Sequence, residues 1–427
     1  MSSRALLGFP AGAPERRLVG ALAGTTILLW LGASAILPLL PVYLRREGSS
    51  TALVGIVMAS YFAASVLTQY PVGRLSDRVG RRPVVVGGLA VFALGSVGFA
   101  LFSSPGPAIA FRSLQGVGAG AVTVAAAAAI GTLVPAGERG AAFGALYGSQ
   151  MLALALGPLV GSIVGGTSMR ILFLAAAAAA LAAGAPVLAV LPRGQETLAG
   201  DRRRSPRRHR VLRSRPALGV LVAFAVSGAF AGMYETCWTL LLRLRHAADY
   251  QIGLSWTLFA LPYALLSVPA GRLATRADRR LLAVGAIVWT AGFCLSYPLL
   301  PGGWLLVALG CLEAVGSVVG TAPALLVLTE HTPPGYQGAA QGAVETARTA
   351  TTAASAAVAG ALFGVAPLVP FAVASAVGLA GALAVVLLWH SLPPPLALSP
   401  VAAELLAAER GSGAPDAPAR GPGPPDR

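Results

Sequence analysis

The chain has 427 residues, of which 56% are hydrophobic and only 11% are charged. A soluble chain of this length normally carries about twice that charge, so the composition excludes an ordinary soluble globular protein. The net charge of +15 invites a nucleic-acid-binding interpretation, but the placement of the arginines along the chain, described below, argues against nucleic acid as a partner.

Apolar stretches long enough to cross a bilayer, about 20 residues each, follow one another along the chain. The first six cover residues 18–43, 52–72, 83–103, 108–134, 141–167 and 170–192. The second six cover residues 217–243, 251–270, 281–300, 303–328, 338–362 and 367–391. Backbone polar groups cannot stay unpaired in hydrocarbon, so each stretch should be a helix. The predicted fold class is an all-α membrane protein with 12 transmembrane helices.

The two sets of six are copies of one unit. Residues 73–82 (GRLSDRVGRR) return as residues 271–280 (GRLATRADRR), a shift of 198 positions with six of ten residues identical. The same shift pairs Gly55 with Gly253 and Pro71 with Pro269. Matches at one offset across most of each half predict two six-helix repeats with the same orientation in the membrane.

Arginine placement sets the expected topology. With the N-terminus inside, 24 of the 31 basic residues fall in inner segments and 5 in outer loops. The positive-inside rule then puts both termini in the cytoplasm of a multi-pass protein of the cell membrane. The expected organisation is a first half (1–192), an Arg-rich cytoplasmic linker (193–216), a second half (217–391) and a disordered tail (392–427) with one short helix near 400–410. The linker is interpreted as a tether that lies over the anionic inner leaflet, with a regulatory role as the alternative.

The segment that joins the second and third spans carries a specific motif: Gly73, Asp77, Arg78, Gly80, Arg81 and Arg82. It resembles the signature loop of the major facilitator superfamily of transporters. The second copy has Thr275 in place of the acid and Asp278 in place of the glycine, so it looks degenerate.

Two further motifs resemble the same superfamily. Span 4 contains Arg112, Gln115 and Gly116, similar to its Arg-x-x-Gln-Gly motif. Span 5 contains Gly157, Pro158 and Gly161, similar to the Gly-Pro-x-x-Gly motif typical of its exporters, although Ala153 and Ser162 replace two expected glycines. The resemblance covers about residues 18–391 and implies a twelve-helix alternating-access carrier like the drug:proton antiporters. It also implies a part for Arg112 in proton coupling; a structural hydrogen-bond hub with Gln115 is the alternative.

Ionisable residues inside spans are costly and by default indicate function. Glu235 lies in span 7 and is a candidate for the group that binds and releases a proton in each transport cycle. Its neighbours Tyr234 and Trp238 could stack on an amphipathic or cationic substrate, or could simply anchor the helix at the membrane surface. Glu313 in span 10 matches Gln115 at the repeat offset and is a candidate for proton or substrate binding or for a structural hydrogen bond.

Glu345 and Arg348 in span 11 are three residues apart, hence on one helical face. A self-contained ion pair is the favoured interpretation, and a gate that changes partners is the alternative. Span 1 carries no acid, which puts in doubt the coupling scheme that several multidrug antiporters of the superfamily use.

Together these features predict a secondary-active carrier, a proton-coupled exporter of small amphipathic compounds or drugs. A proton-coupled uptake symporter is the first alternative, and a membrane receptor or enzyme a remote one. No GxxxxGK[ST] loop is present, so ATP drive is not expected. The four histidines, at positions 209, 246, 331 and 390, are scattered, so neither enzyme, metal site nor cofactor is predicted. The expected partners are a small-molecule substrate, protons and the lipid bilayer, and a monomer suffices because one chain supplies both halves.

Overall fold

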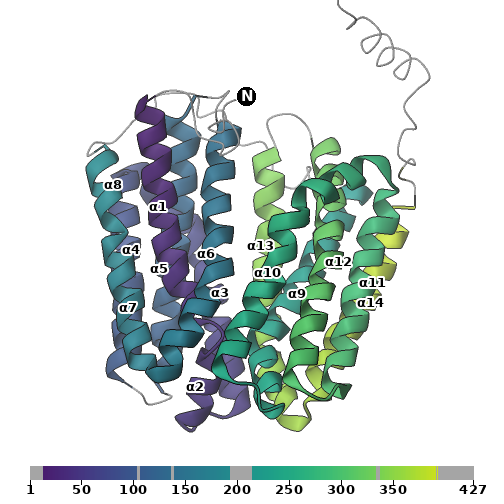
Figure 1. Cartoon of the computed structure of the whole chain (residues 1–427). Helices are drawn as coiled ribbons and strands as arrows, with labels where there is room; N and C mark the ends of the chain where they lie inside the picture. Colours follow the sequence, from purple (N-terminus) through teal and green to yellow (C-terminus); the bar gives the residue numbers. More distant parts are fainter. Residues whose placement is uncertain are drawn as a thin grey trace, which may run out of the picture.

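In the computed structural model the chain is described over residues 13–102, 106–135, 139–192, 214–332, 337–390 and 392. The predicted linker and tail therefore lie almost wholly outside the described residues. Within these ranges the regular structure is entirely helical, and Figure 1 shows the helices as two side-by-side bundles.

The first bundle contains α1 to α8. Their bounds are α1 Ala13–Ile36, α2 Leu40–Arg46, α3 Thr51–Val79, α4 Arg81–Leu101, α5 Ala108–Leu133, α6 Arg139–Thr167, α7 Met169–Ala182 and α8 Gly184–Val190. The Leu37-Pro38-Leu39 turn separates α1 from the short α2, because Pro38 and Pro41 disfavour a continuous helix here. The first predicted span is thus one long helix followed by a turn and a second, short helix.

The second bundle contains α9 to α14. Their bounds are α9 Arg215–Leu244, α10 Asp249–Arg276, α11 Arg279–Ser296, α12 Gly303–Glu330, α13 Gln337–Val365 and α14 Leu368–Leu388, with a 3-10 turn over Tyr297–Leu299. Serine side chains start several helices in both bundles: Ser50 accepts a hydrogen bond from the Leu53 amide and Ser214 from the Ala217 amide. Such caps satisfy amides that have no partner within the helix.

Ten helices in the described part of the chain are long and apolar enough to cross a membrane, with α7 and α8 counted as one. The other two predicted spans correspond to α10 and α13, which are 28 and 29 residues long. Each bundle has its own buried core. The largest apolar cluster draws its buried residues from the first bundle, with Ala356 as the one contribution from the second.

The sequence suggested a loop at residues 73–82, but most of this motif is helical in the structure. Residues 73–79 form the last two turns of α3. Gly80, with φ of +95°, is the single residue between the end of α3 and the start of α4 at Arg81. A left-handed residue of this kind favours glycine because a Cβ would clash. In the second copy Asp278 occupies the break and caps α11 by accepting hydrogen bonds from the amides of Arg280 and Leu281.

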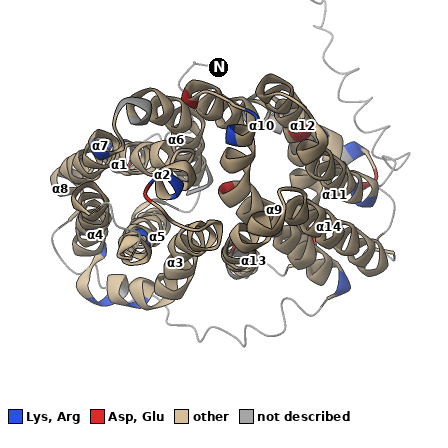
Figure 2. Cartoon of the chain, turned by 90° about the horizontal axis from the view of Figure 1, so that it is seen from below, with Lys and Arg blue, Asp and Glu red and all other residues tan. Residues whose placement is uncertain are grey.

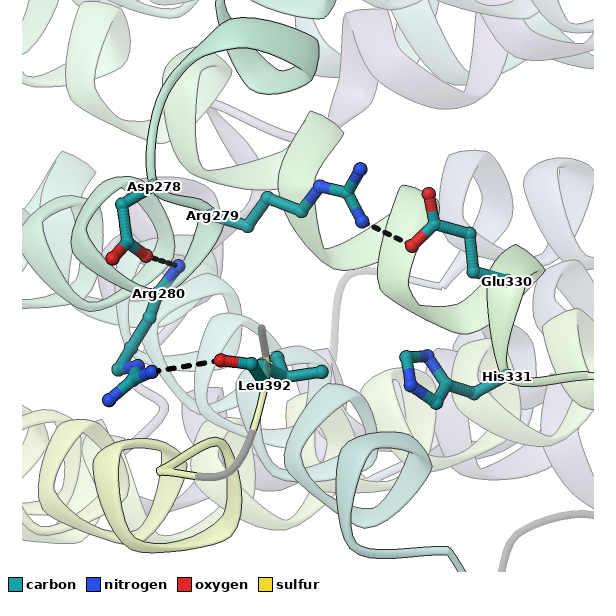
Figure 3. A pocket seen from close by; sticks show the side chains of 6 residues that line it. All are labelled: Asp278, Arg279, Arg280, Glu330, His331 and Leu392. Atoms are coloured by element: carbon teal, nitrogen blue, oxygen red, sulfur yellow. Dashed lines mark hydrogen bonds and ion pairs between the residues drawn. The ribbon is translucent and has the colours of Figure 1, made fainter. Parts of the chain in front are cut away.

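The repeat is visible in equivalent contacts. Arg82 donates to the carbonyl of Leu191 at the end of α8, and Arg280, 198 positions later, donates to the carbonyl of Leu392 beyond α14. Arg45 donates to the carbonyl of Ser49, as its counterpart Arg243 donates to that of Ala247. Figure 3 shows Arg280 reaching Leu392, and beside it the ion pair of Arg279 with Glu330.

The two bundles meet through α3 with α13 and through α6 with α10, which lie side by side in the view along the bundles (Figure 2). Gly55 of α3 faces the Ala356 carbonyl and Gly360 of α13. Its repeat equivalent, Gly253 of α10, faces Pro158 and Ser162 of α6. These contacts lie near the end of the molecule that carries α2, which we call the α2 end.

Toward the opposite end the facing helices present exposed side chains. Tyr147 and Met151 of α6 are 49% and 51% exposed, and Leu265 of α10 is 66% exposed. Most arginines of the described ranges, including Arg74, Arg81 and Arg279, lie toward this opposite end, which we call the arginine-rich end. The bundles are therefore packed together at the α2 end and expose their facing surfaces toward the arginine-rich end.

Candidate functional site

The span 4 motif forms a buried polar cluster in the first bundle. Arg112 is 1% exposed and donates to the side-chain oxygen of Gln115 at 2.8 Å, and Gln115 in turn donates to the hydroxyl of Ser96 at 2.9 Å. The guanidinium also lies over the ring of Tyr61, 4.5 Å from its centre, a distance at which a cation is attracted to the ring face. The motif thus does act as a hydrogen-bond hub.

Gly116 of the same motif allows α5 to approach α3. A Cβ added at this position would overlap the backbone carbonyl of Tyr61. The close approach brings the Tyr61 ring under Arg112. Gly116 and Arg112 of the motif therefore both contact Tyr61, Gly116 at its backbone and Arg112 at its ring.

The span 5 motif lies between the two bundles. Gly157 and Gly161 of α6 pack against Ser34 and Ala35 of α1, where any Cβ would overlap. Ser34 also donates to the carbonyl of Ala153 at 2.9 Å. Pro158, on the neighbouring face, meets Gly253 of α10. One face of the motif therefore binds α6 to its own bundle, and the next face touches the other bundle.

Glu313 of α12 is buried, at 1% exposure, in the second bundle. Its Oε1 accepts a hydrogen bond from the hydroxyl of Tyr234 at 2.9 Å, and its Oε2 accepts one from the hydroxyl of Tyr297 at 2.7 Å. Two phenols thus satisfy both oxygens of a carboxyl that is held away from water. The group has the partners that a buried polar side chain requires.

The two aromatic candidates of span 7 are engaged inside the second bundle. Tyr234 points to Glu313, and the indole of Trp238 donates to the hydroxyl of Ser255 at 2.9 Å. Trp238 also packs edge-on against Tyr297, with ring centres 4.9 Å apart. Trp238 is 6% exposed and therefore lies in the core rather than at a membrane surface.

Glu235 follows Tyr234 in the chain but lies in a different setting. Its side chain is half-buried, and Oε2 is buried with no hydrogen-bond partner among the described residues. The positive charges of Arg112 in the first bundle and Arg348 in the second both act on this carboxylate. Glu235 is thus the candidate acid placed between the bundles.

Glu345 and Arg348 of α13 form an ion pair with each other, as their spacing predicted. Both side chains are exposed, at 52% and 41%, toward the region between the bundles. Tyr147 of α6, the repeat equivalent of Glu345, lies within electrostatic reach of Glu345. This pair is accessible in the observed state, whereas Glu313 is not.

The remaining motif residues lie at the arginine-rich end, away from these acids. Gly73 lies near Val124 of α5, and Arg81 donates to the hydroxyl of Ser76 at 3.2 Å. Arg78 is exposed on the last turn of α3. The side chain of Asp77 lies outside the described residues.

The sequence did not indicate Tyr297 or Tyr61 as part of the site. At the repeat offset of 198, Tyr297 corresponds to Phe99 of the first copy, so the second copy carries a hydroxyl where the first has none. Comparison of the two copies could have identified it. Tyr61 touches Arg112 through a ring face, a contact that no spacing rule reveals.

Comparison with known proteins places the chain in a family. The profile of the Major Facilitator Superfamily matches residues 22–246 and 238–419. The inner membrane transport protein YajR of Escherichia coli (strain K12) is 39% identical over 154 residues, 34% of this chain and 33% of YajR. The chain therefore aligns with about a third of the length of that relative.

A longer match is the class E tetracycline resistance protein of Escherichia coli, 28% identical over 69% of this chain and 75% of that protein. Among solved structures, a bacterial homologue of the human lysosomal transporter Spinster, in an inward-facing and occupied conformation, superposes with a TM-score of 0.71. That match covers 94% of this chain and 98% of the other at 13% identity, so it shows the fold alone. The chain belongs to the Major Facilitator Superfamily of membrane transporters and is a multi-pass protein of the cell membrane.

Proposed function

We propose that the protein is a secondary-active exporter that couples the outward movement of small amphipathic compounds to the inward movement of protons. Glu235 carries this proposal: it is an acid between the bundles whose Oε2 has no hydrogen-bond partner among the described residues. An acid in this position is able to take up a proton from one side of the membrane and release it to the other.

Two further observations support export. The tetracycline resistance relatives align over most of this chain. The span 5 motif, which resembles that of exporters, lies where α6 meets α10. The carried compound would cross unchanged, since the proposal involves no chemical step on it.

Alternating access supplies the mechanism. If the arginine-rich end is cytoplasmic, as the positive-inside rule predicts, the observed state is closed outside and open inside. The two halves, residues 1–192 and 217–391, would rock about a site between them near the bilayer midplane, as in carriers built from repeats. The linker 193–216 would tether them on the cytoplasmic side.

The test is proton release from energised inside-out vesicles on addition of a panel of amphipathic compounds. Wild-type protein should release protons on addition of a substrate, and Glu235→Gln should reduce that release at least tenfold. Glu330→Gln serves as the matched control, because Glu330 pairs with Arg279 at the arginine-rich end and should leave the release intact.

Two results would contradict parts of the proposal. Release that survives in Glu235→Gln would move the proton site to Glu313 or Glu345. No release from folded wild-type protein would contradict proton antiport, and substrate uptake driven by an imposed inward proton gradient would then establish the symport alternative.

A further inference from the structure

A stripe of polar side chains runs along one face of α9 toward the α2 end. Glu235, Thr239 and Arg243 are spaced four residues apart, so they follow one another on the same face of the helix. Each has a buried side-chain atom with no hydrogen-bond partner among the described residues: Oε2 of Glu235, the hydroxyl of Thr239 and Nε of Arg243. Buried polar groups are normally hydrogen-bonded, so three such atoms on one helix face require an explanation.

The neighbouring side chains of α9 show that this feature is confined to the stripe. The other hydrogen-bonding side chains of residues 234–239 all have partners within the second bundle: Tyr234 with Glu313, Thr236 with the carbonyl of Ala356, Cys237 with that of Ala359 and Trp238 with Ser255. The residues off the stripe therefore fix α9 in its own bundle, and the residues on it keep hydrogen-bonding capacity in reserve.

Thr239 departs from the ordinary behaviour of a helical threonine. Its side chain is 0% exposed. A buried threonine inside a helix commonly donates to the carbonyl four residues earlier. Thr123, Thr132 and Thr349 each make this bond at 2.9 Å. Thr239 makes no such bond, so its hydroxyl is available to another group.

The group that the hydroxyl can serve is the carboxyl of Glu235. Side chains of a helix lean toward its N-terminus, so the Thr239 hydroxyl lies over the turn that carries Glu235, on its α2 side. Residues four apart have β-carbons about 5–6 Å from each other, a gap that a glutamate side chain can span. One turn further along, Arg243 is 27% exposed and pairs with Asp249 at the surface. Thr239 is therefore the hydroxyl between the buried acid and the α2 surface.

We propose that the Thr239 hydroxyl relays protons between Glu235 and the water on the α2 side of the membrane. The proposal rests on the proposed function and adds a residue to its proton path. In uptake, a hydronium ion gives a proton to the Thr239 oxygen while the hydroxyl proton passes to Oε2 of Glu235. The threonine ends as it began and the acid has gained one proton. The reverse sequence returns one proton to the α2 side.

The relay is closed in the observed state. Thr239 is 0% exposed, and Leu240, Leu241 and Leu242, which follow toward the α2 end, are 6%, 1% and 0% exposed. Water reaches the hydroxyl only after the α2 end loosens. Proton exchange with that side is thus confined to the state in which the opposite end is shut, which is a requirement of coupled transport.

The other acids of the second bundle that approach this region are already engaged. Glu313 of α12 accepts hydrogen bonds from two tyrosines, and Glu345 of α13 is paired with Arg348. The described residues of α14 carry no charged side chain. The positive charges that act on Glu235 come from Arg112 and Arg348, and an arginine does not give up its proton. Thr239 is left as the group that can carry a proton to Glu235 from the α2 side.

The first experiment separates the proton steps from the rest of the cycle. The full-length protein in liposomes is given ethidium, an amphipathic dye, in two assays. One measures transport driven by a pH gradient, and the other measures exchange of radiolabelled for unlabelled ethidium without a gradient. Exchange needs only the loaded carrier to cross, whereas driven transport needs a proton from the α2 side in each cycle. Thr239→Val, similar in size but without the hydroxyl, should lower the driven rate at least fivefold and leave exchange within twofold.

Two variants serve as controls. Thr239→Ser keeps the hydroxyl and should restore the driven rate. Thr236→Val removes a buried hydroxyl off the stripe and should leave the ratio of driven transport to exchange at the wild-type value. A wild-type ratio in Thr239→Val would overturn the relay. Equal loss of both rates in Thr239→Val and Thr239→Ser would also overturn it, because the residue would then be structural.

The second experiment needs no substrate. Thr239→Cys is introduced in a chain whose three native cysteines are replaced, and whole cells are treated with a membrane-impermeant methanethiosulfonate. The relay requires water at this position from the α2 side, so Thr239→Cys should react at least tenfold faster than Leu240→Cys, which is buried beside it but off the stripe.

The two experiments distinguish failure of the relay from failure of proton antiport. Equally slow labelling of both cysteines would overturn the relay even where the vesicle assay shows substrate-triggered proton release. Rapid labelling of Thr239→Cys, with gradient-driven uptake that is lost in Thr239→Val, would support the relay while contradicting export. If wild type carries no ethidium, the labelling rates alone decide.

Discussion

At the scale of single residues, the second bundle holds two acids in different surroundings. Glu313 has both oxygens satisfied by phenols inside the bundle, whereas Glu235 lies between the bundles with an oxygen that has no partner among the described residues. Both were identified from the sequence, because a carboxyl inside an apolar span is costly without a role. Their surroundings were not, because Tyr297, which donates to Glu313, and Arg112, whose charge acts on Glu235, come from other segments of the chain.

The hydroxyl of Tyr297 should contribute measurably to stability. Tyr297→Phe removes one donor from a buried carboxyl, and loss of a hydrogen bond to such a group costs about 1–3 kcal/mol. We expect a lower apparent melting temperature of the purified protein in detergent, followed by tryptophan fluorescence. Tyr250→Phe is the matched control, because that ring is 52% exposed and should leave the melting temperature unchanged. Equal melting curves for both variants would show that the Tyr297 hydroxyl does not hold Glu313.

At the scale of helices, close approach depends on glycines at specific positions. Gly116 allows α5 to meet α3, and Gly253 allows α10 to meet α6. The family motif indicated the first, and the repeat offset that pairs Gly55 with Gly253 indicated the second. The partner helix of each became known only from the fold.

Gly116→Ala should destabilise the first bundle. The new methyl group would overlap the Tyr61 carbonyl, and overpacking of this kind costs about 1–3 kcal/mol. The measurement is the midpoint of thermal aggregation of detergent-solubilised protein. Gly131→Ala on the same helix is the control: nothing lies within 4 Å of its Cβ position, so the change should be neutral or stabilising by up to about 1 kcal/mol. A Gly116→Ala variant as stable as Gly131→Ala would contradict the close α3–α5 packing.

Gly253→Val should weaken closure at the α2 end, because the side chain would overlap Pro158 and Ser162 of the other bundle. Thr257, whose hydroxyl donates to the carbonyl of Ala155 at 2.7 Å, reports on this junction. A cysteine introduced by Thr257→Cys should react at least tenfold faster with a membrane-impermeant maleimide added outside when it is combined with Gly253→Val. Gly271→Val, on the same helix in open space, should not change the rate. No acceleration with Gly253→Val would mean that this junction is not a closing contact.

At the scale of the whole molecule, the bundles close at one end and expose facing side chains toward the other. The arginine count predicts that the exposed end faces the cytoplasm. A green fluorescent protein fused after residue 427 should therefore fluoresce, since it matures in the cytoplasm, whereas alkaline phosphatase fused there should be inactive. Fusions after Gly302, which precedes α12 at the α2 end, should behave in the opposite way. The same reporter activity at both positions would contradict the topology.

The sequence alone determined the helical fold, the two-copy organisation and the identity of the costly residues. The length of an apolar stretch, the positions of glycine and proline and the placement of charges are local properties of the sequence. Because an apolar stretch in a membrane must be helical, these properties predict where helices begin and end. The observed α4, α5 and α12 begin and end within two residues of their predicted bounds. Only the tertiary structure decided that residues 73–79 continue α3, that Tyr234 turns to Glu313 while Glu235 turns to the other bundle, and that Arg112 rests on Tyr61. These facts depend on how helices cross and how far side chains reach, which is a property of pairs of distant segments rather than of any one of them.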